Sequence, residues 1–342
     1  MSEQSEKKVY LSASRMGTYD KCSWQYWCKY VLKLPDTTND GAIRGSICHL
    51  ILELLLKPRH KKYYDKIIET QDIAFTPAVD KVVIKHLKQQ NAFTEENYDL
   101  CNKMIYVGLD NDFFGGEGAR IDTPEKEFTI ESKKPKYNIR GYIDKPIEYD
   151  EEKILKIVDY KTSKAKFKGE ELESNIQAMM YSLAAKKEFP KMKRRIVQFL
   201  FLKFPRAPKQ ELEFTDEQLK GFEYHLENIN NALSNFDEDS AKSNYAADNG
   251  NQWLCGPAKS GWICPFHKPF NYYVLLDEDG NRIKSSFEND FKPSEGQSVE
   301  QMRYAGCPRK MSGSQECFGC DEKKSSDDFD DFDNSSLDDF DF

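Results

Sequence analysis

A predicted β-hairpin near the middle of the chain constrains the fold most, because it gathers charged side chains. Its strands are expected around Tyr137–Tyr149 and over Ile154–Tyr160. Side chains alternate along a strand, so Asp159 and Lys161 share one face. The hairpin can bring Asp144 towards Asp159, which would place two carboxylates and one ammonium group in a small volume. Such groups are costly to bury unless they are paired or have a chemical role.

Two carboxylates next to a lysine indicate a candidate Mg²⁺ site. Mg²⁺ takes oxygen ligands, few of them from the protein, and keeps several waters. A lysine beside the ion can orient or activate a water, or stabilise developing charge. An aspartate and a lysine two residues apart can also form a solvated ion pair on a sheet surface, so this motif alone leaves both interpretations open.

The composition is that of a globular protein without a membrane-spanning or secretory segment. The chain has 342 residues, 39% of them hydrophobic, which is enough for one large domain or two ordinary ones. No apolar run approaches about 18 residues, and the N-terminus has no apolar signal region. Nine cysteines without a signal indicate a reducing compartment. We therefore expect a cytoplasmic protein without membrane contacts, located in the host cytoplasm if the protein is viral.

Three regions follow from the patterns along the chain. Residues 1–240 are expected to form an α/β domain, with a helical insertion at residues 60–112, where apolar residues recur at helical spacing. Residues 241–324 form a cysteine-containing region that could bind a metal. Residues 325–342 are expected to be a disordered acidic tail, because they combine much like charge with little apolar surface.

Predicted helices supply the remaining candidates. A helix from Leu11–Ser14 to Pro35 is rich in aromatic residues, which could pack in the core or stack on bases. His49 follows one turn after a glycine near a helix start, and could be a core residue or a metal ligand. Gln177 and Tyr181 are four residues apart, so they share one helix face. They could be a boundary pair or could hydrogen-bond a nucleotide or a metal ligand.

Together these motifs resemble those of PD-(D/E)xK nucleases of the RecB/Cas4-like branch, in the same order. The motifs are Gly45-x-x-x-His49, Gly141-Tyr-Ile-Asp144, Asp159-Tyr-Lys161 and Gln177-x-x-x-Tyr181. The resemblance covers roughly Leu11–Phe204. It implies an α/β fold with a restriction-endonuclease-like core, in which helices flank a central mixed sheet and the metal lies at the edge of the sheet.

The resemblance also implies a role for each motif residue. The implied ligands of Mg²⁺ or Mn²⁺ are His49, Asp144, Asp159 and the main-chain carbonyl of Tyr160. The implied catalytic residues are Lys161, Asp144, Asp159, Gln177 and Tyr181. Lys161 would position or activate the attacking water during phosphodiester hydrolysis.

The implied function is that of a metal-dependent DNA exonuclease in replication, recombination or repair. It would act on single-stranded DNA or on duplex ends. A structure-specific DNA endonuclease and a non-cleaving DNA-binding scaffold are the alternatives. The sequence has no P-loop motif, so a coupled helicase would have to be a separate chain.

Some members of this branch carry a 4Fe–4S cluster, held by one cysteine of the first helix and three near the C-terminus. Cys22 matches the first position, and one candidate set is Cys22, Cys307, Cys317 and Cys320. In a second interpretation, Cys255, Cys264 or His267 joins the last three cysteines around Zn²⁺. In a third, several are plain thiols. The remaining cysteines are expected in the core, namely Cys28, Cys48 and Cys101.

The acidic tail carries all of the net charge of −8. Residues 327–342 hold eight Asp and four Phe, and the rest of the chain has 50 acidic and 50 basic residues. The tail resembles the acidic, Phe-ending tails of single-stranded DNA-binding proteins, which engage basic, apolar-lined pockets on replication and recombination proteins. A partner-docking role is therefore expected, while simple solubilisation or competition with DNA stays open.

Overall fold

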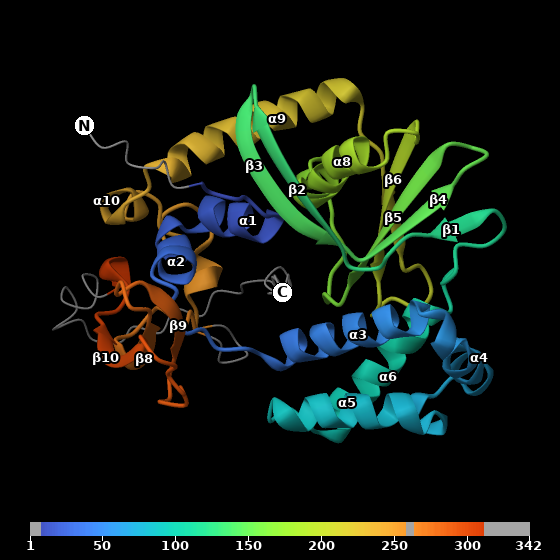
Figure 1. The fold of residues 1–342 in the computed structure, drawn as a ribbon, viewed down its shortest axis with the longest axis horizontal. Helices are drawn as coiled ribbons and strands as arrows, with labels where there is room; N and C mark the ends of the chain where they lie inside the picture. Colours follow the sequence, from blue (N-terminus) through green and yellow to red (C-terminus); the bar gives the residue numbers. More distant parts are fainter. Residues whose placement is uncertain (1–7, 258–262, 311–342) are drawn as a thin grey trace, which may run out of the picture. The chain divides into compact units, whose positions relative to one another are not determined.

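The computed structural model describes residues 8–257 and 263–310 (Figure 1). The chain divides into two compact units. Of the described residues, 8–13 and 38–234 belong to the first unit, and the others belong to the second. The acidic tail, Cys317 and Cys320 lie outside the described residues.

A five-stranded mixed sheet forms the centre of the first unit. Its strand order is β1-β4-β5-β6-β7. The strands are β1 (Ala119–Ile121), β4 (Lys145–Tyr149), β5 (Ile154–Lys161), β6 (Arg194–Phe201) and β7 (Lys209–Leu212). Only β5 and β6 run parallel. A parallel pair needs a crossover, and helices α7 (Glu170–Glu173) and α8 (Ile176–Glu188) provide it.

The strand predicted around Tyr137–Tyr149 is in fact two strands. β3 (Lys136–Ile143) pairs with β2 (Lys126–Lys133) in a separate hairpin, whereas β4 pairs with β5. The alternation of side chains continues from β3 into β4, so the sequence pattern does not reveal that two separate strands are present. Asp144 is the residue between β3 and β4, and the change of pairing partner places it at the junction of the two sheets.

Helices cover both faces of the five-stranded sheet. On one face, Val158 and Tyr160 of β5 join an apolar cluster with residues of α3, α5 and α6. This helical layer comprises α3 (Asp40–Leu56), η2 (Pro58–His60), α4 (Lys61–Thr70), η3 (Ile73–Phe75), α5 (Pro77–Gln89) and α6 (Glu95–Leu109). Helices α4, η3, α5 and α6 fall within residues 60–112, where the sequence predicts helices. Alternation turns Asp159 and Lys161 to the other face, where α8 packs against β6.

A further helix, α9 (Asp216–Ser234), packs on β3 and α8. A capping box starts it, because the Thr215 N–H donates to Gln218 Oε1 at 2.8 Å and the Gln218 N–H donates to Thr215 Oγ1 at 3.2 Å. The β2–β3 hairpin, α8 and α9 lie beside one another in Figure 1. The predicted class, an α/β core with a mixed sheet flanked by helices, is confirmed.

The second unit combines short helices with a three-stranded antiparallel sheet. Its sheet order is β10-β8-β9, formed by β8 (Phe270–Leu276), β9 (Arg282–Ser286) and β10 (Ser298–Tyr304). Its helices are α1 (Ala13–Lys21), α2 (Ser23–Tyr26), the π-helix η1 (Trp27–Val31), α10 (Glu238–Ala241) and η4 (Gln252–Cys255). Among the described helices of either unit, none is long and apolar enough to cross a bilayer.

The sequence predicts a single aromatic helix that runs up to Pro35, and this prediction is wrong. The helix is interrupted at Cys22. Cys22 has an extended backbone, and the Ser23 N–H donates to the Asn244 carbonyl at 2.8 Å instead of continuing the helix. A contact distant in sequence therefore overrides the local helical pattern. The break leaves the Cys22 side chain at the start of α2.

Candidate active site

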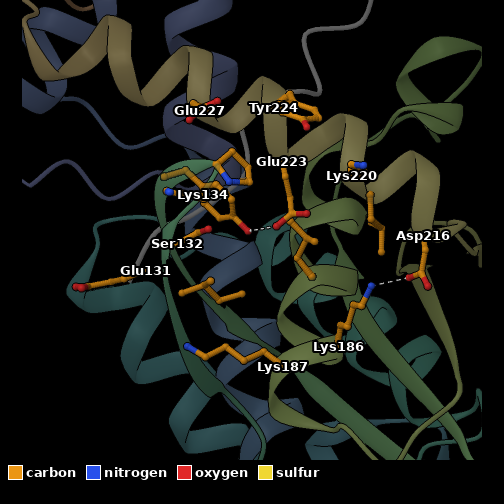
Figure 2. A pocket seen from close by; sticks show the side chains of 15 residues that line it. Glu131, Ser132, Lys134, Lys186, Lys187, Asp216, Lys220, Glu223, Tyr224 and Glu227 are labelled. Atoms are coloured by element: carbon orange, nitrogen blue, oxygen red, sulfur yellow. Dashed lines mark hydrogen bonds and ion pairs between the residues drawn. The ribbon is translucent and has the colours of Figure 1, made fainter.

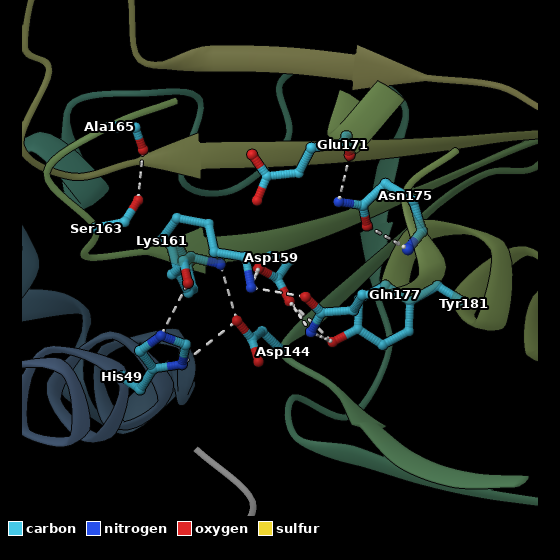
Figure 3. Close-up of polar contacts among 12 residues, drawn as sticks. His49, Asp144, Asp159, Lys161, Ser163, Ala165, Glu171, Asn175, Gln177 and Tyr181 are labelled. Carbon is cyan, nitrogen blue, oxygen red and sulfur yellow. Dashed lines mark hydrogen bonds and ion pairs between the residues drawn. The ribbon is translucent and has the colours of Figure 1, made fainter. Parts of the chain in front are cut away.

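The sequence-predicted site residues meet at one end of β5 in the first unit (Figure 3). α3 supplies His49, the β3–β4 junction supplies Asp144, and α8 supplies Gln177 and Tyr181. β5 ends on Asp159, Tyr160 and Lys161. Antiparallel pairing sets Lys145 opposite Val158, so Asp144 comes next to Asp159 as the predicted hairpin required.

The Tyr160 peptide group links His49 with Asp144. The Tyr160 N–H donates a hydrogen bond to Asp144 Oδ2 at 2.8 Å, and the Tyr160 carbonyl oxygen lies 3.0 Å from His49 Nε2. The other ring nitrogen, His49 Nδ1, lies 3.4 Å from Asp144 Oδ2. Both ring nitrogens therefore face oxygen atoms, an arrangement that suits the doubly protonated imidazolium.

His49 and Asp144 each stabilise the charged form of the other. Burial alone would lower the pKa of His49, but the Asp144 carboxylate, together with Asp159 and Glu125, raises that pKa to about 9. Burial alone would raise the pKa of Asp144, but His49, together with the Tyr160 N–H and Lys161, holds that pKa below its usual value. A divalent cation bound here would take the place of the imidazole proton, since a ligating histidine must be neutral.

A second network fixes Lys161 and Asp159. Lys161 Nζ donates to Gln177 Oε1 at 2.6 Å and lies 3.2 Å from Asp159 Oδ2. Gln177 Nε2 donates to Asp159 Oδ1 at 3.0 Å, and the Tyr181 hydroxyl donates to the same oxygen at 2.8 Å. Lys161 and Asp159 are both buried. These contacts provide the partners that buried charges need, and they hold the ammonium group beside the carboxylate.

Glu125 also lies at the site, although no sequence motif predicts it there. Its carboxylate, a His49 ring nitrogen and an Asp144 carboxylate oxygen lie within 4.8 Å of one another. The Glu125 N–H donates to the Asp144 carbonyl at 3.1 Å. Burial, followed by the Asp144 charge, raises the pKa of Glu125 to about 7. The register of the β2–β3 hairpin, with Lys126 opposite Ile143, is the signal that could have identified it.

These donors fit a hard divalent cation. They comprise three carboxylates, one imidazole and one peptide carbonyl, without a thiol. Oxygen-rich sets of this kind suit Mg²⁺ or Mn²⁺. The imidazolium of His49 lies among oxygen acceptors, so the local potential already favours positive charge at this position.

A different set of residues lines a groove of about 880 Å³ between the β2–β3 hairpin, α8 and α9 (Figure 2). Its charged residues are four lysines and four acids, namely Lys134, Lys186, Lys187, Lys220, Glu131, Asp216, Glu223 and Glu227. Lys186 pairs with Asp216 at 2.8 Å. A groove with balanced charge does not attract a phosphate backbone, so we do not assign the active site to it.

Four cysteines line one pocket in the second unit. Cys22 precedes α2, Cys255 ends η4, and Cys307 follows β10. Cys264 completes the set, and its N–H donates to the Cys255 carbonyl at 3.2 Å. Burial raises the pKa of Cys264 to about 12, and the nearby thiols of Cys22, Cys307 and Cys255 add to this effect. Cys22 and Cys307 therefore lie with Cys255 and Cys264, the alternative ligands predicted from the sequence.

The spacing of these thiols bears on which metal group they could hold. The structure describes all four, and no three of their sulfur atoms lie within 4.8 Å of one another. Four thiolates on one Zn²⁺ would lie about 3.8 Å apart at the usual Zn–S length. No three of the four thiols therefore lie as close together here as a single Zn²⁺ would hold them. Three further cysteines are buried, namely Cys28, Cys48 and Cys101.

A model of the PD-(D/E)XK nuclease superfamily matches residues 10–267 of this sequence. The chain belongs to this superfamily and is an enzyme of the nuclease class. The matched range contains every residue of the candidate active site, so the family and the site concern the same part of the chain.

Two individual proteins are similar to this chain. An ATP-dependent helicase/deoxyribonuclease subunit of Carboxydothermus hydrogenoformans is 26% identical over 202 residues, which cover 51% of this chain and 18% of that protein. A crystal structure of a protein provisionally named an exonuclease, from Eubacterium rectale, has 12% identity and a TM-score of 0.43. That alignment covers 76% of this chain and 96% of the other. The family assignment rests on the superfamily match.

Proposed function

We propose that this nuclease is a divalent-metal-dependent DNA exonuclease acting in replication, recombination or repair. The observation that carries the proposal is the end of β5, where Asp159 and Lys161 lie buried within 3.2 Å of each other beside Asp144. A carboxylate pair next to a held lysine supplies the groups that metal-assisted phosphodiester hydrolysis needs. The similarity to a subunit named a deoxyribonuclease supports DNA as the substrate.

In the proposed site, His49, Asp144, Asp159 and the Tyr160 carbonyl hold Mg²⁺ or Mn²⁺. The bound ion would polarise the phosphate and lower the pKa of a bound water. Lys161 orients the attacking water, because Gln177 and Asp159 hold its ammonium group in place. Tyr181 fixes Asp159 through its hydroxyl.

The experiment is DNA cleavage with Mg²⁺ or Mn²⁺, by the wild type and by two variants, Asp144→Asn and Lys161→Ala. We expect each variant to lose cleavage by about 100-fold or more, the size of effect seen when a proton-transfer or charge-stabilising group is removed. Lys156→Ala is a matched control on the same strand, because Lys156 pairs with the exposed Glu211 at 3.2 Å and is not a residue of the proposed site. Full activity in either site variant would rule out the assignment.

We further propose that Cys22, Cys255, Cys264 and Cys307 hold a 4Fe–4S cluster. Their common pocket supports this set, whereas Cys317 and Cys320 lie outside the described residues. In this set one cysteine comes from the N-terminal helices and three from the C-terminal region, so the cluster would tie the two segments of the second unit together.

The cluster proposal is tested by the iron content and visible absorbance of protein purified without oxygen. Cys264→Ser should lose both, whereas Cys101→Ala, which removes a buried thiol of the first unit, should keep both. A Cys264→Ser variant with wild-type iron content would show that this set is wrong. Stoichiometric zinc without iron in the wild type would favour the zinc alternative.

We propose that the acidic tail docks on replication or recombination proteins. Its eight Asp and four Phe suit a basic, apolar-lined pocket. Deletion of residues 327–342 should weaken binding to a single-stranded-DNA-processing partner and leave DNA cleavage intact. Unchanged partner binding after the deletion would refute this role.

A further inference from the structure

Two loops leave the central sheet at the same end as the candidate active site. β5 and β6 run parallel, with Lys161 opposite Phe201, so the connections that follow them start side by side. The Leu202 N–H donates to the Lys161 carbonyl at 2.8 Å where both loops begin. In open α/β sheets, ligands bind beyond the carboxyl ends of parallel strands. We call residues 162–169 and 202–208 the basic loop pair.

Several contacts hold the two loops together. The Lys166 ammonium group donates to the Ala207 carbonyl, and the Gln210 side-chain amide donates to the Phe167 carbonyl at 3.1 Å. The Phe167 ring packs edge-to-face on Phe199 of β6, with 4.9 Å between the ring centroids. A surface held in this way presents its charges in fixed positions, which lowers the entropic cost of binding a ligand.

The basic loop pair carries positive charge without any acid of its own. It contains no Asp or Glu, and its cations are Lys164, Lys166, Lys168, Lys203 and Arg206. Lys164, Lys168 and Arg206 are exposed. None of these three side chains forms an ion pair or a hydrogen bond with another described residue. Cations that no acid neutralises attract a phosphate backbone.

Acids border the active site on its other sides. On the β4 side of β5, burial raises the pKa of Glu125, and the charges of Asp144 and Glu53 add to this effect. Helix α7 (Glu170–Glu173), which follows the first loop, holds three more glutamates. Both places repel a negatively charged strand, so the 202–208 side of the basic loop pair offers the strand a favourable path away from the active site.

We propose that the basic loop pair binds the phosphates of the DNA strand that lie next to the cleaved bond, through Lys164, Lys168 and Arg206. The inference rests on the proposed function and deepens it, because it assigns the path of the substrate at the same site. These side chains would hold phosphates that do not react. They should therefore stabilise the bound substrate and the transition state equally.

The test is binding of a fluorescent single-stranded oligonucleotide to the full-length protein in EDTA, measured by anisotropy at several salt concentrations. The triple loop variant combines Lys164→Ala, Lys168→Ala and Arg206→Ala. Each phosphate contact with a single strand contributes about −0.7 to the slope of log affinity against log salt. The triple loop variant should therefore have a slope that is shallower by about 2, and an affinity about 10- to 100-fold lower at about 0.15 M salt.

A matched control removes the same charge from another surface. It combines Lys81→Ala, Lys85→Ala and Lys88→Ala, three exposed positions of α5. This control should keep the slope and the affinity of the wild type. A second control combines Lys164→Arg with Lys168→Arg, and it should also bind as the wild type does, because arginine keeps the charge.

Cleavage kinetics provide an independent readout. The triple loop variant should lower kcat/KM mainly through KM, which should rise by about tenfold or more, because uniform binding of the substrate is lost. A defect in folding would lower kcat in proportion to the folded fraction and would leave KM unchanged.

The outcomes separate this inference from the proposed function. Equal salt slopes and affinities in the triple loop variant and the wild type would overturn the inference even if the wild type cleaves DNA, and so would a wild type that binds no DNA in EDTA or with Ca²⁺. A slope that depends on the three residues would support the inference even in a protein that cleaves no DNA. If the variant kept its DNA affinity and lost affinity for a peptide of residues 327–342, the ligand would be the acidic tail and the inference would be wrong.

Discussion

At the scale of single residues, Gln177 explains how the site keeps two opposite charges in place. Its amide oxygen accepts from Lys161 while its amide nitrogen donates to Asp159. An amide offers both an acceptor and a donor at the end of one side chain. A glutamate at this position would repel Asp159, and a lysine would repel Lys161. The helical spacing to Tyr181 then brings a second donor to the same carboxylate oxygen.

Lys145 is a second buried lysine of the first unit. It is fully buried in the apolar cluster, where its Nζ donates to the Phe113 carbonyl at 3.2 Å and lies over the Phe113 and Tyr160 rings. Burial lowers the pKa of Lys145 to about 7, from a usual value of 10.5. The unfolded chain therefore binds more protons than the folded chain between these two pH values.

This difference in bound protons predicts that the free energy of unfolding rises with pH. Burial of charged Lys145 lowers the free energy of unfolding most below about pH 7. This destabilisation decreases as the pH rises towards 10.5. Between pH 7 and 9, the free energy of unfolding of the wild type should rise by about 2–3 kcal/mol relative to Lys145→Met. Urea unfolding of both proteins in EDTA measures this difference. Parallel pH profiles would show that Lys145 stays charged in the folded protein.

At the scale of elements, one glycine of the β2–β3 hairpin lies close to an aromatic ring that contacts the site. Gly141 pairs directly with Phe128, and a Cβ atom at position 141 would lie 2.9 Å from the Phe128 ring. Phe128 in turn contacts the Tyr181 ring edge-to-face, with 6.2 Å between ring centroids. The glycine of the Gly141-Tyr-Ile-Asp144 motif therefore has a packing role that reaches Tyr181.

Two glycine variants should have opposite effects on stability. Gly141→Ala should destabilise the protein by about 1–3 kcal/mol, because the Phe128 ring must move. Gly221→Ala should stabilise it by about 0.5–1 kcal/mol, because Gly221 lies inside α9, a Cβ atom there would meet nothing within 4 Å, and alanine favours helix. Thermal unfolding of both variants tests the contrast. A Gly141→Ala variant as stable as the wild type would mean that the ring is free to shift.

Local patterns predict those parts of the site that short motifs define. The Asp159-Tyr-Lys161 strand end and the Gln177–Tyr181 helix face follow from periodicity, because period-2 and four-residue spacings hold within one element. Glu125 cannot be found this way, since its role depends on the pairing of two strands. The break at Cys22 likewise depends on Asn244, more than 200 residues away. Pairing partners and long-range hydrogen bonds are decided by the tertiary structure.

At the scale of the whole molecule, the two units carry different chemistry. The first unit holds every residue of the candidate active site, and the second holds the four clustered cysteines. The body of the chain has balanced charge, and the acidic excess lies in residues 327–342. The chain corresponds to 18% of the helicase/deoxyribonuclease subunit that it matches, so the partners and the activity of that larger protein are proposals for this one.

The most direct test of the central claim is cleavage of end-labelled linear DNA and of circular DNA, single- and double-stranded, by the wild-type protein with Mg²⁺, Mn²⁺ or EDTA. We predict loss of linear DNA with either metal, no loss in EDTA, and intact circles. Cleaved circles would contradict the exonuclease and favour an endonuclease. No cleavage of any substrate by folded, metal-loaded protein would contradict the nuclease activity itself and favour a DNA-binding scaffold.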